Sequence, residues 1–434
     1  MATPHRASPN CVLLLLVACL LHHRVAVESL PDEAGLLLQI KRAWGDPPAL
    51  AAWSADASAA GAHCRWPYVG CDSAGSVIKL ALASANIIGA IPDAVGGLSS
   101  LTHLDVSSNS ITGVFPTALY HCHSLRYLNM SWNDIGGELP GDIGNGLGAN
   151  MSTLDLTFNN FNGTIPASLS RLRDLQHLAL GWNHLSGSIP KSMSKLQNLR
   201  SLMLQENSLA GTIPAELGKL TSLQELGLAN SPFDAGTIPP GIWGLKKLRG
   251  LSLCENQLTA GDVVVDGFAA MSLRMIDVSD NNLTGIIPEV FGHLRNLTYL
   301  LLFNNNFSGK IPVSIGLLPL LRILSLSSNR LTGTLPQELG KHSLGLSYVY
   351  VEDNNLTGQI PQWLCAGGQF EQLGASNNLL NGSIPVGLAR CHTLQYLDLH
   401  SNQLTGDIPG SLGYDMPLLQ TLNLANNELS GSIC

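Results

Sequence analysis

One phrase, L-x-x-L-x-L-x-x-N-x-L-x-G-x-I-P, recurs from Val77 to the end of the 434-residue chain. Successive starts are 24 to 26 residues apart, and the last unit is incomplete. The fifteen starts are Val77, Leu101, Leu125, Met151, Leu175, Leu199, Leu223, Leu248, Leu273, Leu297, Leu321, Leu346, Phe370, Leu394 and Leu419. Fifteen matches exclude coincidence, so the chain must fold as a stack of one small structural unit.

The alternating L-x-L places two apolar side chains on one side of a short strand. A single strand of this kind cannot bury its apolar face, whereas stacked neighbours can. The repeat therefore predicts an α/β solenoid with a parallel sheet on its inner wall. At about 4.8 Å per strand, fifteen units make a sheet roughly 70 Å long.

The Asn of the phrase falls where the chain turns inward, and its amide can satisfy backbone groups of the adjacent turn. Stacked units then form an asparagine ladder, while Gly permits the next bend and Pro ends backbone pairing on the outer wall. The ladder positions are Asn109, Asn133, Asn159, Asn183, Asn207, Asn256, Asn281, Asn305, Asn329, Asn354, Asn378, Asn402 and Asn427. Ala85 takes this position in the first unit, which is terminal and therefore atypical.

Residues 1–28 differ from the repeats. His5 and Arg6 precede the apolar run Cys11–Leu21, and small residues follow near Val27. This order is typical of a secretory signal peptide, and the run is too short for a membrane-spanning helix, although a membrane anchor is the alternative. The cleavage site is left open. No later segment is long and apolar enough to cross a membrane, so we expect export to the extracellular space or cell surface.

Residues 29–76 are expected to cap the solenoid. In "LPDEAGLLLQIKRAW" the residues Leu36, Leu37, Ile40 and Trp44 fit one face of an amphipathic helix. The segment "CRWPYVGC", residues 64–71, begins and ends with Cys, and a disulfide can close this short loop in an oxidising compartment.

The other cysteines are harder to interpret. Cys122 and Cys391 stand at matching places in "YHCHSL" and "ARCHTL", which indicates buried apolar packing. Together with Cys254, Cys365 and Cys434 they leave an odd number of thiols outside the loop. No Cys or His spacing is typical of zinc, so neither a metal nor a cofactor is expected.

The cap pattern C-x-W…V-x-C (Cys64, Trp66, Val69, Cys71) and the phrase L-x-G-x-I-P together resemble the extracellular part of plant leucine-rich-repeat receptor kinases and receptor-like proteins. The stretch at residues 363–394 is similar to the peptide-receptor branch typified by the HAESA-like kinases. This resemblance implies a right-handed superhelix whose inner surface meets a ligand and then a co-receptor kinase. Tyr68 departs from the family, in which Gly is usual.

The x positions of the strands face outward and decide which ligand fits. Just before the Asn, three units offer a column of aromatic residues, and later units continue this column with acidic residues. An apolar segment followed by an acidic stripe suits an extended peptide with apolar and basic parts. A dozen residues at about 3.3 Å each span about eight units. The candidate groove residues are Trp132, Phe158, Trp182, Glu206, Glu255, Asp280, Phe303, Tyr348, Tyr350 and Asp353. The alternative is that the aromatic residues only pack against one another.

Three features depart from the expected pattern. No inner strand carries the Arg-x-Arg with which some receptors of the resembling branch hold a peptide carboxylate, and "RLR" at 171–173 should face another way. Units seven and eight break the rhythm, with Ser231 at the Asn position and without the Gly and Pro of the phrase after Asn256. We interpret this as drift in an outer loop, and a local loop or bend that forms a contact site is the alternative. Cys434 replaces a Pro in mid-unit. We therefore expect a truncated product, from which a transmembrane helix and a kinase domain are missing.

Eight N-x-S/T sequons occur. Asn129 lies on the inner strand, where a glycan would block binding, and the other seven are expected to include used sites. These are Asn150, Asn162, Asn282, Asn296, Asn306, Asn355 and Asn381.

Charge and motifs exclude several functions. The net charge is −8 and no basic stripe is evident in the sequence, which argues against nucleic acid as a partner. The pairs His103 with Asp105 and Asp398 with His400 lack a third partner on an open sheet, and kinase signatures are absent, so no catalysis is expected. We expect the ligand-sensing part of a plant receptor. The alternative is a secreted inhibitor similar to the polygalacturonase inhibitors.

Overall fold

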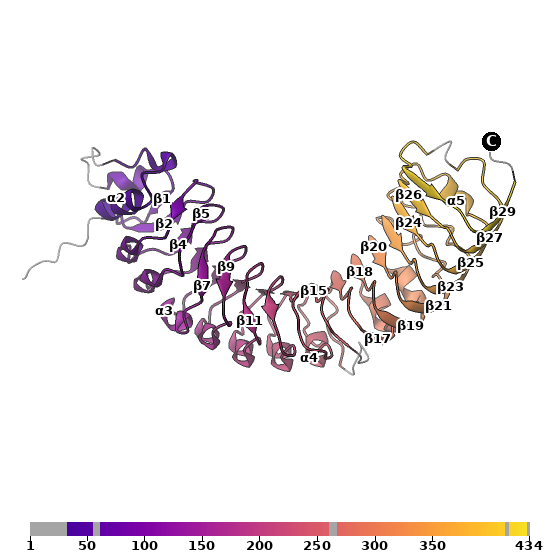
Figure 1. The fold of residues 1–434 in the computed structure, drawn as a ribbon, viewed down its shortest axis with the longest axis horizontal. Coiled ribbons are helices and arrows are strands. Elements are labelled where there is room, and N and C mark those ends of the chain that lie inside the picture. Colours follow the sequence, from indigo (N-terminus) through magenta and orange to yellow (C-terminus); the bar gives the residue numbers. More distant parts are fainter. Residues whose placement is uncertain (1–32, 55–60, 260–266, 413–415, 432–434) are drawn as a thin grey trace, which may run out of the picture.

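The computed structural model describes residues 33–54, 61–259, 267–412 and 416–431. These residues form a long arc that begins with the N-terminal cap and ends near β29 (Figure 1). The expected signal peptide at 1–28, the segment 260–266 and Cys434 lie outside the described residues. Within the described ranges, no helix has both the length and the apolar character needed to cross a membrane.

The inner wall is one 16-stranded sheet whose strand order follows the chain. β1 pairs antiparallel with β2, and every later neighbour is parallel. The strands are β1 (Val69–Cys71), β2 (Val77–Ala81), β4 (His103–Asp105), β6 (Tyr127–Asn129), β8 (Thr153–Asp155), β10 (His177–Ala179), β12 (Ser201–Met203), β14 (Glu225–Gly227), β15 (Gly250–Ser252), β16 (Met275–Asp277), β18 (Tyr299–Leu301), β20 (Ile323–Ser325), β22 (Tyr348–Tyr350), β24 (Gln372–Gly374), β26 (Tyr396–Asp398) and β28 (Thr421–Asn423).

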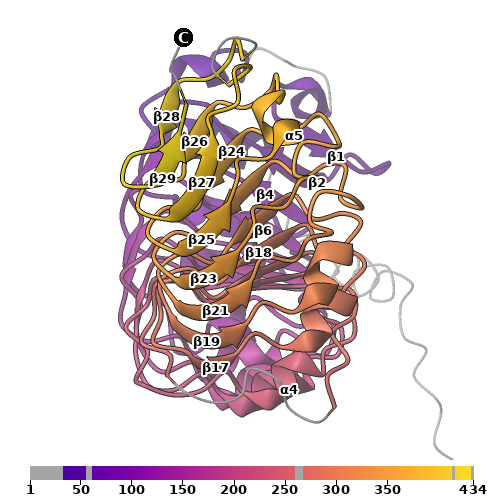
Figure 2. The same ribbon diagram turned by 90° about the vertical axis from the view of Figure 1, so that its right-hand side faces the viewer.

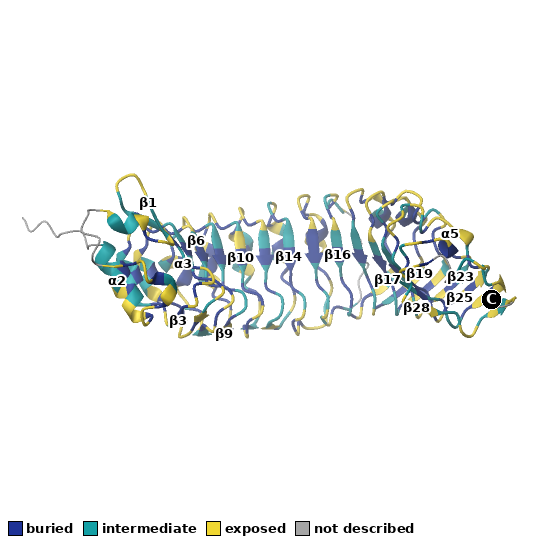
Figure 3. Cartoon of the chain, turned by 90° about the horizontal axis from the view of Figure 1, so that it is seen from above, coloured by how far each residue is buried: buried dark blue, intermediate teal, exposed yellow. Residues whose placement is uncertain are grey.

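The register of this sheet follows from the leucines of the phrase. Leu128 in β6 is aligned with Leu104 in β4 and Leu154 in β8, and all three are buried. The flanking residues Tyr127 and Asn129 are only half-buried, and the alternation of side chains along a strand turns them to the opposite side. The strands of the inner sheet accordingly show both buried and intermediate segments (Figure 3). Each buried Leu contributes roughly 1.5–3 kcal/mol relative to an exposed one, so a register slip would be costly at every unit.

The predicted asparagine ladder is present. The Nδ2 of Asn133 donates to the carbonyls of Val106 (3.0 Å), Met130 (3.1 Å) and Ser131 (3.1 Å), and its Oδ1 accepts from the amide of Ile111 at 2.9 Å. The same four-bond pattern recurs at Asn329. Each amide therefore ties the turn of its own unit to the preceding unit, as the Asn position of the phrase predicts.

Strand pairing continues on the outer wall, which the sequence reasoning missed. A seven-stranded parallel sheet runs along the C-terminal half, and three two-stranded sheets accompany the N-terminal half (Figure 2). The larger sheet contains β17 (Thr284–Ile286), β19 (Asn306–Lys310), β21 (Arg330–Thr334), β23 (Asn355–Gly358), β25 (Leu379–Gly382), β27 (Gln403–Asp407) and β29 (Glu428–Ser430). The pairs are β3 (Ile88–Gly89) with β5 (Ser110–Ile111), β7 (Gly136–Glu138) with β9 (Asn160–Asn162), and β11 (Ser186–Gly187) with β13 (Ser208–Leu209).

These outer strands use the residues before the Pro of the phrase. β21 ends at Thr334, two residues before Pro336, so Pro still ends the pairing as expected. Gly333 within β21 has φ of +76°, a conformation that other residues rarely adopt. The Gly of the phrase thus serves a strand on the outer wall in addition to a bend.

Short helices complete the outer wall after most of the Pro residues of the phrase (Figure 1). The α-helices are α2 (Glu33–Ala43), α3 (Ile143–Gly146), α4 (Pro240–Trp243) and α5 (Val386–Ala389). The 3-10 helices are Pro48–Leu50, Ala62–Arg65, Asp93–Gly97, Thr117–His121, Ala167–Arg171, Lys191–Lys195, Ala215–Lys219, Glu289–His293 and Val313–Leu317.

The cap contains the expected amphipathic helix. Leu37 and Ile40 of α2 are fully buried, and the Glu33 carboxylate accepts the backbone amide of Val77 at 2.7 Å. The rings of Trp53 and Trp66 stack at 5.8 Å. These contacts close the apolar end of the first repeat strand.

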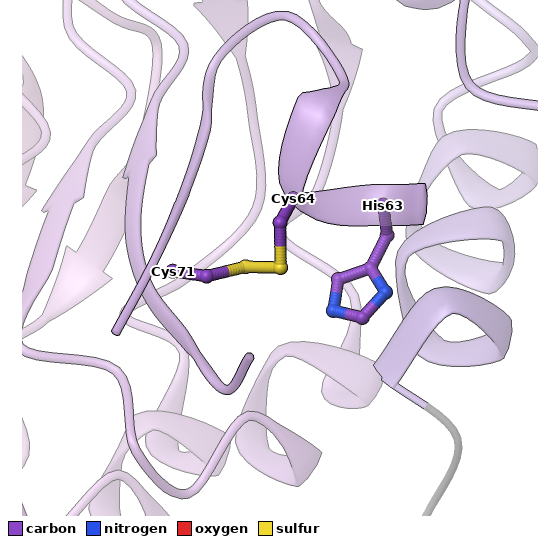
Figure 4. A group of neighbouring side chains, drawn as sticks. All are labelled: His63, Cys64 and Cys71. Atoms are coloured by element: carbon purple, nitrogen blue, oxygen red, sulfur yellow. A yellow bond between two sulfur atoms is a disulfide. The ribbon is translucent and has the colours of Figure 1, made fainter. Parts of the chain in front are cut away.

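The loop at 64–71 is closed by the expected disulfide between Cys64 and Cys71 (Figure 4). His63 lies beside the two sulfur atoms, but sulfurs that are bonded to each other are not thiolate ligands, so this group does not fit a metal. Tyr68 has φ of +69°, which explains why Gly is usual there.

Cys391 corrects one expectation. Cys122 is buried, as predicted, and is free, but Cys391 is joined by a disulfide to Cys365 of the preceding unit. Their sequence separation of 26 corresponds to one turn of the solenoid, which brings the two outer-wall segments together. Interpreting Cys391 as apolar packing alone was therefore wrong.

The irregular units seven and eight do not interrupt the inner sheet. β14 and β15 pair in register, with Leu226 aligned with Leu251. Ser231 replaces the ladder Asn, and its buried Oγ has no hydrogen-bond partner among the described residues. Its backbone amide still donates to the Oδ1 of Asn256 at 3.3 Å, so the ladder continues on one side.

Candidate ligand-binding surface

The three aromatic residues of the column stack face to face. The ring centroids of Trp132 and Phe158 are 3.7 Å apart, and those of Phe158 and Trp182 are 4.5 Å apart, with interplanar angles of 17° and 10°. Trp132 remains 55% exposed and Trp182 39% exposed. The aromatic residues do pack against one another, yet they leave a continuous row of ring edges in solvent.

Their position differs from the expectation in one respect. They do not lie on the strands but in the turn after each strand, three residues beyond the end of β6 in the case of Trp132. Trp132, Phe158 and Trp182 all have positive φ, between +51° and +56°. The later members of the column, such as Glu206 and Asp353, share this conformation. The column therefore follows the edge of the inner sheet at which the strands end.

A shallow hollow of about 580 Å³ follows this aromatic column. It is lined by Trp132, Phe158, Trp182, Glu206, His184, Asp134, Asn160 and the ladder residues Asn109, Asn133, Asn159 and Asn183. Because the ladder amides are held by backbone groups, the floor of the hollow is rigid while its aromatic wall is exposed. A rigid floor beside an exposed apolar wall is suited to binding an extended chain.

The acidic continuation of the column is only partly neutralised. The Asn230 amide donates to Glu206 at 2.7 Å, and the Asn377 amide donates to Asp353 at 2.8 Å. Asp280 accepts from the next unit in the same way, from Asn304 at 2.6 Å. Four acidic residues continue the column, namely Glu206, Glu255, Asp280 and Asp353. None of them forms an ion pair within the described residues.

The second aromatic group is only partly assembled. Tyr348 and Tyr350 stand on β22 with ring centroids 6.3 Å apart. Phe303 joins Tyr350 and Asp353 in a second hollow of about 460 Å³, whereas Tyr348 does not line it. Tyr348 instead donates its hydroxyl to Glu371 at 3.0 Å.

This second hollow contains polar residues that the sequence reasoning did not single out as ligand contacts. Glu352 accepts a hydrogen bond from the hydroxyl of Ser327, and Tyr396 donates to Asp398 at 3.2 Å. Burial raises the pKa of the Glu352 carboxyl, and the charges of Asp398 and Asp353 raise it further. Burial and Asp398 together raise the pKa of Tyr396 to about 12. These polar residues could have been found from the sequence by comparing the equivalent x positions of neighbouring units.

Neither candidate acid–base pair has the geometry of a catalytic site. His103 stacks on the ring of Tyr127 at 4.0 Å, while Asp105 accepts bonds from Ser107, at 2.7 Å from its hydroxyl. His400 does contact Asp398, at 2.6 Å between Nδ1 and Oδ1. Among the described residues, neither pair has a nucleophilic hydroxyl or thiol as the third member of a catalytic triad. These residues also contain no kinase domain.

The remaining predicted surface features have clear positions. Six sequon asparagines are exposed and Asn306 is half-buried; the exposed ones are Asn150, Asn162, Asn282, Asn296, Asn355 and Asn381. The Oδ1 of Asn129 accepts from the hydroxyl of Ser131 at 2.7 Å on the inner face.

The segment "RLR" at 171–173 lies on the outer wall, as expected. Arg171 ends a 3-10 helix, and Arg173 donates to the carbonyl of Lys195.

Comparison with known families agrees with this geometry. A leucine rich repeat N-terminal domain matches residues 30–72. A leucine-rich repeat region matches residues 117–237, and further leucine rich repeat matches cover 76–135, 246–307, 271–331 and 392–433.

Solved structures decide the family. The ectodomain of the Arabidopsis receptor kinase HAESA, solved with an N-terminally extended IDA peptide hormone, is 33% identical with a TM-score of 0.80. The match covers 94% of this chain and 71% of that one. The chain belongs to the plant leucine-rich-repeat receptor ectodomains. The PEPR1–AtPEP1 structure is 30% identical to this ectodomain with a TM-score of 0.79, over 91% of this chain and 58% of that one.

Curated relatives match over shorter lengths. A polygalacturonase inhibitor of Oryza sativa subsp. japonica is 36% identical over 99 residues, which are 23% of this ectodomain and 29% of the inhibitor. A polygalacturonase inhibitor of Pyrus communis is 37% identical over 94 residues, 21% of this ectodomain and 27% of the inhibitor. The ectodomain thus aligns with less than a third of either inhibitor.

Proposed function

We propose that this ectodomain is the ligand-recognition module of a plant cell-surface receptor. It binds a secreted peptide along the inner sheet and then joins a co-receptor kinase. The observation that carries the proposal is the exposed aromatic stack of Trp132, Phe158 and Trp182, which leads into an acidic column on the same edge.

The dimensions support an extended peptide. Trp132 and Asp353 stand nine units apart, which is about 43 Å at 4.8 Å per unit. A peptide of about thirteen residues at 3.3 Å each covers that length. Its apolar part would contact the aromatic edges, and its basic part would neutralise Glu206, Glu255 and Asp280. HAESA and PEPR1, which resemble this ectodomain over most of its length, were solved with IDA and AtPEP1.

The proposal includes export of the ectodomain and its glycosylation. The exposed sequons Asn150, Asn282 and Asn296 are compatible with glycans that leave the inner face open. The second candidate function is inhibition of a cell-wall-degrading polygalacturonase, which the partial sequence match to the two inhibitors favours.

A binding selection separates the two functions. The purified chain is exposed to a random library of extended dodecapeptides, and the same chain is assayed for inhibition of polygalacturonase. The proposal expects peptides to be retained by the chain and lost when Trp132→Ala is combined with Trp182→Ala. Inhibition of the polygalacturonase without peptide retention would contradict it and favour the second function.

A further inference from the structure

A column of arginines follows the opposite edge of the inner sheet, at which the strands begin. Arg200, Arg249, Arg274 and Arg322 each stand one residue before a strand, namely β12, β15, β16 and β20. The Arg274 amide donates to the Arg249 carbonyl at 2.7 Å, so these two arginines are directly stacked. The four positions span five unit steps, or about 24 Å.

These arginines are unneutralised by direct contacts. All four are exposed, and none forms an ion pair within the described residues. The whole chain carries a net charge of −8, so carboxylates are not scarce. Exposed arginines are commonly just solvated, but a column of four at one position of the repeat creates a local positive field.

The positive field of the arginine column acts on one carboxylate of the inner face, that of Glu225. The Glu225 carboxylate lies over Gly250, where an added Cβ would come within 1.9 Å of its Oε2. Burial raises the pKa of Glu225, while the charges of Arg249 and Arg274 act in the opposite direction. The surface above Gly250 therefore holds a carboxylate that lies in the positive field of Arg249 and Arg274.

The inner face is consequently polarised across its width. The edge at which strands begin is basic, and the edge at which they end carries Glu206, Glu255 and Asp280. Arg274 and Asp280 belong to the same unit and are six residues apart, which sets an upper limit of about 20 Å on the width because Asp280 lies in the turn after β16. This width fits an extended peptide whose side chains point to both edges. The long Arg and Glu side chains of the two edges extend towards the peptide.

We propose that the peptide ligand is itself polarised, with anionic side chains along one edge and cationic side chains along the other. Its anionic edge, carrying carboxylate or sulfate groups, lies against the arginine column with its centre at Arg249 and Arg274. This inference rests on the proposed peptide-binding function. Side chains on one edge of an extended peptide recur every ~6.7 Å, so the column takes three or four of them. Planar guanidinium groups suit such oxyanions.

Two octapeptides of identical composition test the polarity. In Ac-Glu-Lys-Glu-Lys-Glu-Lys-Glu-Lys-NH2 one extended edge is wholly acidic and the other wholly basic. In Ac-Glu-Glu-Lys-Lys-Glu-Glu-Lys-Lys-NH2 each edge carries both charges. Calorimetric titration of the full chain at low salt should show the alternating peptide binding about fivefold more tightly. Combining Arg249→Gln with Arg274→Gln should remove this preference, whereas Arg171→Gln with Arg173→Gln, on the outer wall, should retain it.

The outcomes are separable from those of the proposed function. Equal binding of the two octapeptides, absence of binding by both, or loss of the preference in the outer-wall variant would overturn the polarity. A random library that still yields retained peptides would leave the proposed function standing. Failure of the library together with absence of binding by both octapeptides would contradict the proposed function as well. Glu225→Gln adds a second measurement, because removing the resident carboxylate should strengthen binding of the alternating peptide.

Discussion

The ring of Phe158 lies between those of Trp132 and Trp182, with centroid distances of 3.7 and 4.5 Å. Phe158 therefore connects two exposed indoles that are otherwise two units apart. A column of this kind holds each ring in one orientation, because movement of any ring would leave a gap against its neighbours.

Replacing Phe158 with Ala should separate the two indoles and lower affinity for a library-selected peptide by about tenfold. A tenfold loss of affinity corresponds to about 1.4 kcal/mol of binding free energy, which we assign to the lost aromatic contact and ring orientation. Fluorescence anisotropy with labelled peptide measures the change. Phe268→Ala, which alters an aromatic residue in the outer wall, is the control, and equal losses in both variants would contradict a role for the column.

Removal of a ladder amide should destabilise the solenoid. Asn133→Ala leaves the buried amide of Ile111 without its partner and removes one of the two amide donors from each of the carbonyls of Val106 and Met130, so the free energy of unfolding should fall by about 3 kcal/mol. Urea titration followed by circular dichroism measures this. Asn145→Ala, at an exposed position, should change stability by less than about 0.5 kcal/mol. Similar effects for both would show that the ladder is not stabilising.

The left-handed turn position should tolerate Gly and reject branched residues. Ser108 has φ of +55° in the same column as Trp132, and it is exposed. Ser108→Val should lower the free energy of unfolding by about 1 kcal/mol, whereas Ser108→Gly should not lower it. Thermal unfolding of the two variants compares them directly. A Val variant as stable as the Gly variant would mean that this position relaxes to another conformation.

The two free thiols among the described residues, Cys122 and Cys254, should be inert in the folded chain. Burial raises the pKa of Cys122 to about 11, and burial together with Asp277 raises that of Cys254 to about 12. The thiolate is the reactive form, so iodoacetamide at about pH 8 should modify neither thiol before denaturation and both thereafter. Peptide mass mapping measures this, and it should also recover Cys365 linked to Cys391. Rapid labelling of Cys365 or Cys391 without reductant would contradict the disulfide.

Glu352 should make the stability depend on pH. Its pKa is raised in the folded state, so the folded chain holds this proton more tightly than the unfolded chain does. Stability from this group therefore rises as pH falls through the folded pKa, above the ordinary value of 4.5. Glu352→Gln should be the more stable chain at pH 7, and its advantage should shrink towards pH 5. Chemical unfolding at both pH values measures the gap, and a constant gap would exclude this role.

The repeat predicted the inner sheet because the leucine spacing alone determines which residues stack. Leu104, Leu128 and Leu154 recur at one position of the phrase and become register partners. The asparagine ladder was predictable for the same reason, since one amide satisfies one fixed set of backbone groups. The stacking of Trp132 on Phe158 also follows from column position.

Other features depend on geometry that the phrase does not encode. Large aromatic residues rarely adopt positive φ, so the turn conformation of Trp132 and Trp182 could not be predicted from residue type. Pairing on the outer wall depends on how closely successive units approach there. The link between Cys365 and Cys391 requires knowing that two irregular outer segments face each other. The polar hollow around Glu352 is assembled from side chains of several strands.

The most direct measurement compares Trp182→Ala with Trp363→Ala. Both side chains are 39% exposed, but Trp182 belongs to the aromatic column and Trp363 follows Pro361 on the outer wall, away from the inner sheet. Each variant is titrated with a peptide selected on the unmodified chain. The account predicts that affinity falls at least about tenfold for Trp182→Ala and stays within about twofold for Trp363→Ala. Equal affinities for the two variants, or a loss confined to Trp363→Ala, would contradict ligand binding along the inner sheet.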